Sequence, residues 1–152
     1  MELPDDLPVR NNIVRALYAN PDMFRGFASL SGRVHSASHL PDRIRELVVL
    51  RITGMLGAEV EWRPHARMAA RLGLSDEELA AIREGDFASF SDSERTALEF
   101  AGAVDATAVD DDVWKRARAH YSEIQLLDMT QVAAFYGLAA RVALALDIEP
   151  DA

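Results

Sequence analysis

Cysteine is absent from this sequence of 152 residues. Without cysteine the chain has no disulfide bond, no thiolate nucleophile and no cysteine-ligated metal ion. Thiol chemistry is therefore excluded, whatever fold the chain adopts.

Basic residues are scarce relative to acidic ones, with 16 Lys and Arg against 25 Asp and Glu, and the formal net charge is -9. Such a charge disfavours phosphate-rich partners, so we expect neither nucleic acid nor an anionic membrane surface as a partner. No apolar run is long enough to cross a bilayer. The first ten residues, MELPDDLPVR, hold acidic side chains and prolines where a signal peptide needs a basic start and an apolar centre, so we expect a cytoplasmic protein.

The sequence also lacks the strict alternation of apolar and polar residues that is typical of a half-buried strand. Apolar residues make up 49% of the chain and recur at helical spacing instead. A chain of this length usually forms one domain. The sequence therefore predicts an all-α single domain over residues 1–152, a bundle of roughly seven helices whose motif-bearing core spans residues 41–104.

Proline, serine and glycine mark the expected helix ends. Helices are predicted to begin near residues 12, 21, 42, 58, 75, 91, 112 and 123, and the last one to reach residue 146. Residues 1–10 are interpreted as an irregular lead-in. The second helix is expected to end within residues 31–39, and its buried face is expected to comprise Met23, Phe24, Phe27 and Leu30.

The stretch from Arg43 to Gly73 joins two apolar helix patterns. Its first half is apolar around most of the helix circumference, which is typical of a central helix. Gly54 and Gly57 bracket a short turn that would fold the following helix back antiparallel. Because a proline is tolerated mainly in the first turn of a helix, Pro64 raises the alternative that the second helix of this hairpin begins close to residue 61 rather than residue 58.

Three polar residues of this hairpin are candidate catalytic residues: Glu46, Glu61 and His65. Glu61 and His65 are four residues apart, which puts both on one face of a helix. Antiparallel packing would bring Glu46 to the same place. Two nearby carboxylates favour a charged imidazolium between them, so we expect His65 to donate a proton near neutral pH.

Three short patterns resemble the carboxymuconolactone decarboxylase and alkylhydroperoxidase D-like family of small all-α proteins. They are Arg-Glu-Leu-x-x-Leu-Arg at 45–51, Glu-Trp-x-x-His at 61–65 and Gly-Leu-Ser-Asp-Glu-Glu at 73–78. The resemblance covers about half of the chain well. It implies a helical bundle of the alkylhydroperoxidase D type that assembles as a homotrimer or hexamer.

In the redox branch of that family, a glutamate is followed by a Cys-x-x-Cys pair and then by a histidine. The resemblance places Glu46 and His65 at the glutamate and histidine positions, and Ala58 and Glu61 at the cysteine positions. Because a thiolate is the nucleophile that peroxide reduction requires, this chain cannot be a thiol peroxidase, even if it belongs to the peroxiredoxin-like group. The resemblance to the decarboxylase branch of the family implies acid–base chemistry that uses the same histidine and a nearby glutamate.

The function that we favour is a cofactor-independent carboxy-lyase that acts on a small carboxylated or lactone substrate. Decarboxylation requires a proton donor and stabilisation of the negative charge on the lactone carbonyl. His65 is the predicted acid, and Glu46 or Glu61 would orient it. Arg51 is a candidate for binding a substrate carboxylate, and Trp62 for lining the substrate site, although a core or subunit contact suits Trp62 better.

Three other interpretations compete with this one. The spacing of Glu46, Glu61 and His65 matches neither di-iron bundles nor zinc peptidases, so no metal is expected. Residues 68–75 resemble the start of a helix-turn-helix, but three acidic residues open the next helix, which does not suit DNA binding. A non-catalytic oligomeric scaffold, in which the polar residues fix helix register, stays open.

The remaining histidines are assigned structural roles. His35 and His39 lie in the weakly patterned segment after the second helix, where we expect them to face solvent or to stabilise the loop. His120 lies near the end of a predicted helix and is expected to interact with the helix dipole there.

Overall fold

The computed structural model describes residues 12–151, and this part of the chain forms eight α-helices and no strand. The helices are α1 (Asn12–Leu17), α2 (Pro21–Ser36), α3 (Asp42–Leu56), α4 (Glu59–Arg71), α5 (Asp76–Glu84), α6 (Asp92–Asp105), α7 (Asp111–Arg118) and α8 (Glu123–Ala145). The predicted all-α bundle is confirmed. The predicted lead-in at residues 1–10 lies outside the described residues.

Local sequence signals set most helix starts. Ser75, Ser91 and Ser122 each accept a hydrogen bond from the backbone three residues later, and the side chain of that later residue binds back to the serine N–H. Such reciprocal capping satisfies two backbone donors at once. The helices predicted from Ser75 and Ser91 therefore begin where expected. Helix α7 ends at Arg118, shortly before Ser122 caps the next helix.

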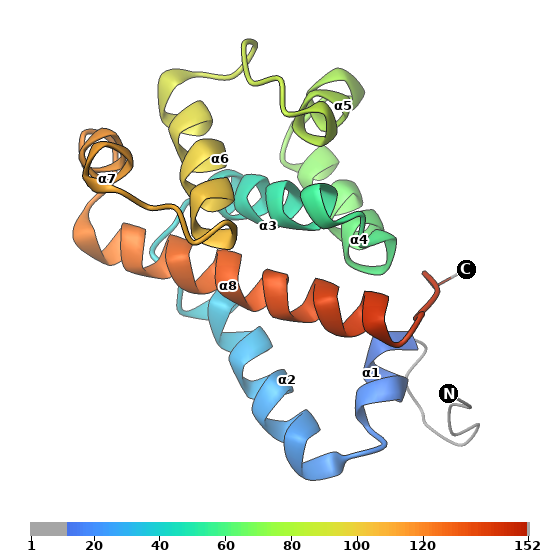
Figure 1. The fold of residues 1–152 in the computed structure, drawn as a ribbon. Coiled ribbons are helices and arrows are strands. Elements are labelled where there is room, and N and C mark those ends of the chain that lie inside the picture. The colour runs from blue at the N-terminus through green and yellow to red at the C-terminus, as the bar shows by residue number, and fades with distance from the viewer. Residues whose placement is uncertain (1–11, 152) are drawn as a thin grey trace.

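Helix α3 lies at the centre of the fold and packs against α4, α5, α6 and α8 (Figure 1). Its apolar side chains from residue 47 to residue 50, together with Ile52, are fully buried. This confirms that α3 is the central helix. Because these side chains are covered within the chain, they are not available for subunit association.

The α3–α4 hairpin brings the candidate residues together. Gly57 adopts a left-handed conformation with φ 71°, which reverses the chain with no steric cost. The helix that follows begins at Glu59, so Pro64 lies at its sixth position. This agrees with the predicted start near residue 58, and the alternative start near residue 61 is wrong. Proline lacks an N–H, so the carbonyl of Val60 loses its usual helical donor, and packing of α4 on α3 keeps the helix continuous across that gap.

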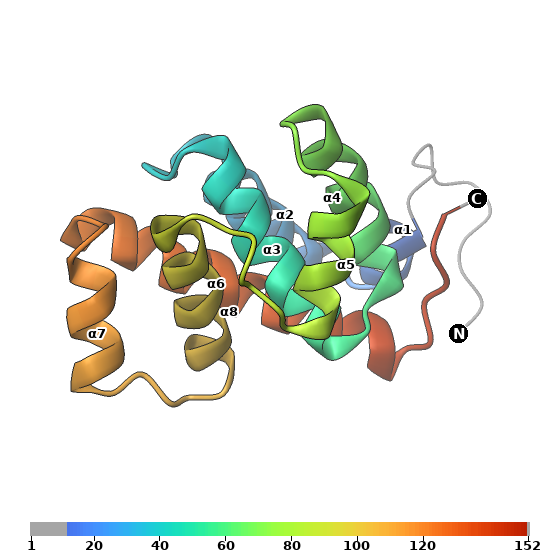
Figure 2. The ribbon, with the colours of Figure 1, turned by 90° about the horizontal axis from the view of Figure 1, so that it is seen from above.

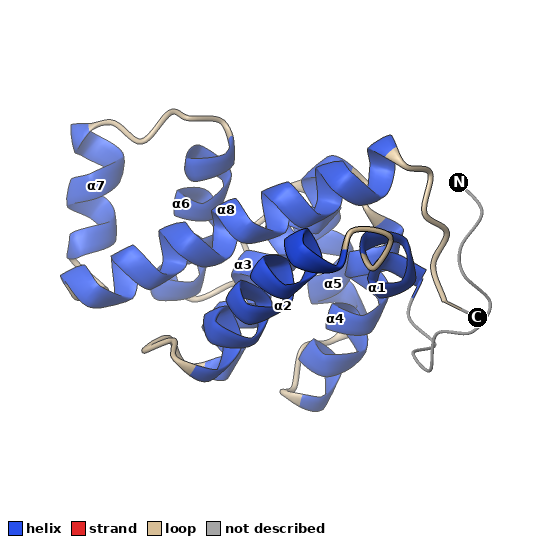
Figure 3. Ribbon diagram, turned by 90° about the horizontal axis from the view of Figure 1, so that it is seen from below, coloured by secondary structure: helices blue, strands red, loops and turns tan. Residues whose placement is uncertain are grey.

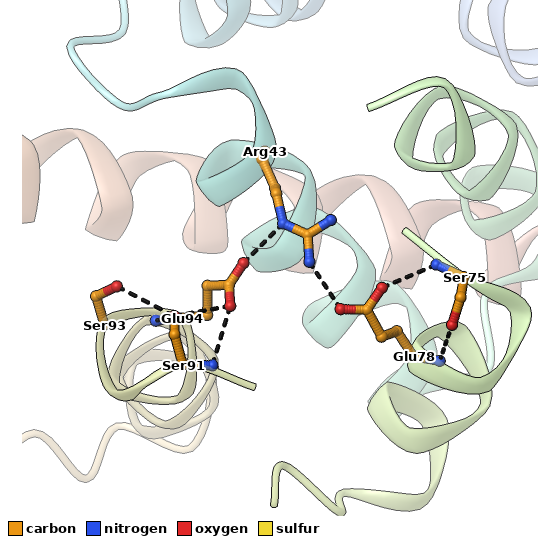
Figure 4. Close-up of polar contacts among 6 residues, drawn as sticks. All are labelled: Arg43, Ser75, Glu78, Ser91, Ser93 and Glu94. Carbon is orange, nitrogen blue, oxygen red and sulfur yellow. Dashed lines mark hydrogen bonds and ion pairs between the residues drawn. The ribbon is translucent and has the colours of Figure 1, made fainter. Parts of the chain in front are cut away.

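One side chain of α3 ties two other helices to it. Arg43 donates from Nε to Oε1 of Glu94 and from Nη2 to Oε1 of Glu78, each at 2.7 Å. These glutamates are the third residues of α5 and α6 and already complete the two capping boxes (Figure 4). Arg43 therefore fixes the first turns of α5 and α6 against α3.

Helix α2 departs from the prediction. Met23 and Leu30 were expected in the core, yet they are 72% and 45% exposed, and Phe24 and Phe27 are only half-buried. Only the later part of α2 crosses the rest of the fold, and the earlier part projects away from it (Figures 1 and 3). The periodicity correctly identified an apolar face, but no described helix covers the first half of that face.

Both ends of α8 meet other parts of the chain. Its first half lies beside α6 and α7, and its last turn lies near α1 and the C-terminus (Figure 2). The side chain of Asp151 accepts a hydrogen bond from the N–H of Asn12 at 2.8 Å, which links the two ends of the described chain. None of the eight helices is long and apolar enough to span a bilayer.

Candidate active site

A short hydrogen bond joins Glu46 and His65 in the interior of the α3–α4 hairpin. Nδ1 of His65 lies 2.7 Å from Oε2 of Glu46. The Glu46 side chain is fully buried, and His65 is 8% exposed. A carboxylate on Nδ1 fixes the ring orientation and leaves Nε2 as the nitrogen that can exchange a proton with a ligand.

The surroundings of Glu46 explain how a carboxylate can be buried here. Besides His65, the guanidinium of Arg45 approaches it, with Nε of Arg45 3.7 Å from Oε1 of Glu46. Arg45 is itself almost buried and forms an ion pair with Asp42 at 2.9 Å. Buried charges are tolerated when opposite charges and hydrogen bonds accompany them. The pair of residues 45 and 46 therefore forms a charged centre among the mostly apolar buried side chains of α3.

Glu61 lies close enough to His65 to interact with it electrostatically, but among residues 12–151 the two side chains form no hydrogen bond with each other. Its side chain is half-buried. Burial raises the pKa of Glu61 above its ordinary value of 4.5, the His65 side chain opposes this rise, and Asp151 adds to it. The four-residue spacing did place Glu61 and His65 close enough to interact electrostatically. The carboxylate that holds the imidazole, however, is that of Glu46.

Two further residues complete the cluster, and neither was selected from the sequence. The ring of His35 stacks on the ring of His65, with 5.7 Å between the centroids and 7° between the planes. Tyr136 presents its ring edge-on to His65, with the centroids 4.9 Å apart. The Tyr136 hydroxyl lies 2.7 Å from Nε2 of His35. Four side chains from α2, α3, α4 and α8 therefore meet at one place.

The expectation that His35 faces solvent in a loop is wrong. Helix α2 continues to Ser36, so His35 stands in its last turn, where it is half-buried. Gly32 and the neighbouring serines have low helix propensity, but the neighbouring Val34 is buried in the main core of the protein. Packing therefore extends the helix past the point where propensity alone would end it.

The sequence indicates the burial of Tyr136 but not its place in this cluster. The pattern at residues 135–146 predicts a buried helix, and the structure confirms the helix as far as Ala145, although Leu138 and Leu146 are exposed. A buried tyrosine in a helix signals nothing more than a need for a hydrogen-bond partner. That partner lies 101 residues away in the sequence. No local pattern connects positions so far apart.

Arg51 and Trp62 lie in other surroundings. The Arg51 guanidinium stacks over the Phe87 ring at 4.9 Å, and its Nη1 is 3.5 Å from the carbonyl of Ile82. These contacts direct Arg51 towards α5, away from the face of α3 that carries Glu46. Trp62 is buried beneath the guanidinium of Arg83, which lies 3.9 Å from the ring centroid. A substrate contact by either residue stays a prediction.

The remaining histidines lie outside the cluster. The backbone N–H and Nδ1 of His39 both bond to Oδ2 of Asp128, which holds the loop after α2 against α8. His120 follows the end of α7 and is exposed. Among residues 12–151, no three His, Asp or Glu side chains gather in an arrangement that would hold a metal ion.

Proteins of known structure with a similar fold identify the fold type of this chain. The chain is similar to ATU0492 of Agrobacterium tumefaciens, a protein of unknown function, with a TM-score of 0.82, 22% identity, and coverage of 90% of this chain and 96% of that one. The alkylhydroperoxidase AhpD core protein of Ralstonia eutropha JMP134 gives a TM-score of 0.82 at 20% identity over 97% of this chain and 86% of that one. The debrominase Bmp8 gives a TM-score of 0.80 at 21% identity, with coverage of 93% of this chain and 78% of that one. These likenesses establish the alkylhydroperoxidase D-like fold.

Sequence comparison gives the family. The uncharacterized protein YnjA of Escherichia coli (strain K12) is 38% identical over 84 residues, which are 54% of this chain and 46% of that protein. The match thus spans about half the length of this curated relative. The profile of the carboxymuconolactone decarboxylase family matches residues 21–103, which is more than half of the chain and includes His35, Glu46 and His65. This protein therefore belongs to the carboxymuconolactone decarboxylase family, as a member without the redox cysteine pair.

Proposed function

We propose that the protein is an acid–base enzyme of the carboxy-lyase type, which acts on a small carboxylated or lactone substrate without a cofactor. The observation that carries this proposal is the 2.7 Å bond between buried Glu46 and His65. A histidine that is held on Nδ1 by a carboxylate is a common arrangement for proton transfer at Nε2. Membership of the carboxymuconolactone decarboxylase family supports the choice of substrate class.

The proposed reaction uses His65 as the acid. The bond between the substrate carbon and its carboxylate breaks, carbon dioxide leaves, and the electron pair spreads onto the conjugated lactone carbonyl. The protonated imidazole of His65 then delivers the Nε2 proton to carbon and recovers a proton from water. Glu46 stabilises the imidazolium and keeps Nδ1 protonated throughout.

A thiol peroxidase activity is not part of the proposal. One structural relative is an AhpD core protein, but dithiol chemistry needs two cysteines and this chain contains none. A second structure of Bmp8 is of a cysteine-to-alanine variant in complex with 2,3,4-tribromopyrrole. The same fold therefore carries different chemistry in different proteins, and the side chains at the site decide which chemistry is possible.

We also propose that the protein is cytoplasmic and associates as a homotrimer or hexamer. The exposed apolar side chains of α2 and of the second half of α8 support self-association. Met23, Leu30 and Leu138 line a groove of about 390 Å³ between these helices, together with three phenylalanines. Contiguous apolar surface of this kind is uncommon on proteins that remain monomeric.

The test uses carboxymuconolactone, the compound that gives the family its name, with release of carbon dioxide as the readout. We expect turnover by the wild-type protein and loss of turnover in His65→Ala, with unchanged helical content by circular dichroism. The matched control is His120→Ala, at an exposed position outside the site. Full activity of His65→Ala would contradict the proposal. Absence of turnover in the wild-type protein would favour the non-catalytic scaffold.

A further inference from the structure

We propose that His35 is a second functional imidazole of this site, a neutral N–H donor that Tyr136 orients and that binds a carbonyl or carboxylate oxygen of the substrate beside His65. This inference rests on the proposed acid–base function of the Glu46–His65 pair. It assigns to that site a separate residue for the oxygen on which negative charge accumulates.

The hydrogen bond between Tyr136 and His35 determines which ring nitrogen of His35 carries the proton. Within residues 12–151, the Tyr136 hydroxyl has one hydrogen-bond partner, Nε2 of His35 at 2.7 Å. A buried phenol needs an acceptor for its hydrogen, and Nε2 can accept only through its lone pair. The hydroxyl therefore donates to Nε2, and the proton of the neutral His35 ring is on Nδ1.

The electrostatics of the cluster keep both groups neutral. Burial raises the pKa of the Tyr136 phenol, and the carboxylates of Glu61 and Glu46 raise it further, while Arg45 opposes them. Burial lowers the pKa of His35, the His65 side chain and Arg45 lower it too, and Glu46 opposes them. Tyr136 therefore remains a hydrogen-bond donor, and His35 has little tendency to take up a second proton.

The two stacked imidazoles are complementary in their free nitrogens. His65 is held at Nδ1 by Glu46, which leaves Nε2. His35 is held at Nε2 by Tyr136, which leaves Nδ1–H. The ring planes are parallel within 7° and the centroids are 5.7 Å apart, so the two imidazoles stack directly on one another. One ring exchanges a proton, and the other offers a fixed donor.

This arrangement suits a substrate whose oxygen gains negative charge during the reaction. In the proposed decarboxylation, charge spreads onto the lactone carbonyl as carbon dioxide leaves. A neutral N–H donor already in position stabilises this oxygen with little reorganisation. His35 is half-buried rather than sealed in the core, so it is the more exposed of the two imidazoles.

The first test measures the His35 tautomer in the ligand-free protein by long-range ¹H–¹⁵N correlation. We expect the Nδ1–H tautomer in the wild-type protein and a shift towards the Nε2–H form in Tyr136→Phe. The matched control is Tyr121→Phe, which removes another 2.7 Å tyrosine hydrogen bond, to the carbonyl of Ser93, and should leave His35 unchanged. An Nε2–H tautomer, or a protonated His35 ring at neutral pH, in the wild-type protein would overturn the assignment.

The second test asks whether His35 acts on the substrate. With carboxymuconolactone as the probe, His35→Leu is expected to lower kcat at least a hundredfold, the usual loss for one oxyanion donor. The amide N–H of His35→Asn stands where Nδ1–H stood, and this variant should recover at least tenfold over His35→Leu. Equal losses in both variants would indicate a role in packing alone. Full activity of both, with an inactive His65→Ala, would refute the His35 inference and leave the proposed function intact.

Discussion

The imidazole rings of His35 and His65 are stacked, although they belong to different helices. The angle between the ring planes is 7°, and the ring centroids are 5.7 Å apart. Tyr136 forms a hydrogen bond with Nε2 of His35, whereas Glu46 forms one with Nδ1 of His65. Burial and the neighbouring His65 side chain both lower the pKa of His35, which favours the neutral form of that ring.

Replacing the buried carboxylate should impair proton transfer. We expect Glu46→Gln to lower the decarboxylation rate about 10²- to 10⁴-fold, because a neutral amide neither stabilises the imidazolium nor keeps His65 in one tautomer. Steady-state kinetics with carboxymuconolactone measures the effect. Glu99→Gln makes the same charge change on an exposed part of α6 and should leave the rate unchanged. A similar rate for Glu46→Gln and the wild-type protein would remove Glu46 from the mechanism.

Glu61 should make stability depend on pH. Burial raises its pKa in the folded protein above the ordinary value of 4.5, so the folded state binds this proton more tightly than the unfolded state. The contribution is fully present below pH 4.5 and is lost as the pH rises through the raised pKa. We therefore expect the free energy of unfolding of Glu61→Gln, relative to wild type, to be higher at pH 7 than at pH 4.

Urea denaturation of both proteins at the two pH values measures this difference, since other titrating groups are common to both. A relative gain by the wild-type protein between pH 4 and pH 7 would mean that ionised Glu61 is stabilised by the fold. The same variant should retain turnover within several-fold of wild type, because Glu46 and not Glu61 bonds to His65. A loss as large as that of His65→Ala would assign the proton transfer to Glu61.

Gly54 should not tolerate a side chain. A Cβ at this position would stand 2.8 Å from Cζ3 of the buried Trp62 ring, so Gly54→Ala should destabilise the protein by about 1–3 kcal/mol. Gly26→Ala is the matched control, since nothing lies within 4 Å of its Cβ position in α2. That variant should gain about 0.5–1 kcal/mol from helix propensity. Equal thermal denaturation midpoints of the two variants would show that the hairpin adjusts freely.

Removing Arg43 should loosen α5 and α6 from α3. Arg43→Met keeps much of the aliphatic stem and removes both ion pairs, and we expect a loss of about 1–2 kcal/mol, because the partners are only partly exposed to solvent. Arg25→Met breaks an exposed pair with Asp22 and should change stability by less than about 0.5 kcal/mol. Chemical denaturation compares the two variants. Indistinguishable losses would mean that the Arg43 bridge adds little.

A charge in the apolar groove should weaken self-association. We expect Leu138→Glu to reduce the molar mass measured by size-exclusion chromatography with light scattering, because Leu138 lines the groove between α2 and α8. Leu127→Glu adds the same charge at an exposed position of α8 outside the groove and should leave the mass unchanged. A wild-type protein that elutes as a monomer at all concentrations would contradict the proposed oligomer.

The sequence alone determined the helical class, most helix starts and the exclusion of thiol chemistry. These features depend on neighbouring residues or on composition: a serine and a glutamate three residues apart cap a helix wherever it packs, and an absent cysteine stays absent. The hairpin was also predictable, because Gly57 takes a left-handed conformation that favours glycine.

Only the tertiary structure decided which side chains meet. Glu61 is four residues from His65 and shares its helix, yet the carboxylate that bonds to the imidazole is Glu46, which the α3–α4 packing brings to it. His35 and Tyr136 reach the site from helices at opposite ends of the chain. Their positions depend on how helices cross and on which face each one buries. No local pattern encodes that outcome, because every buried face is compatible with several partners until the core is packed.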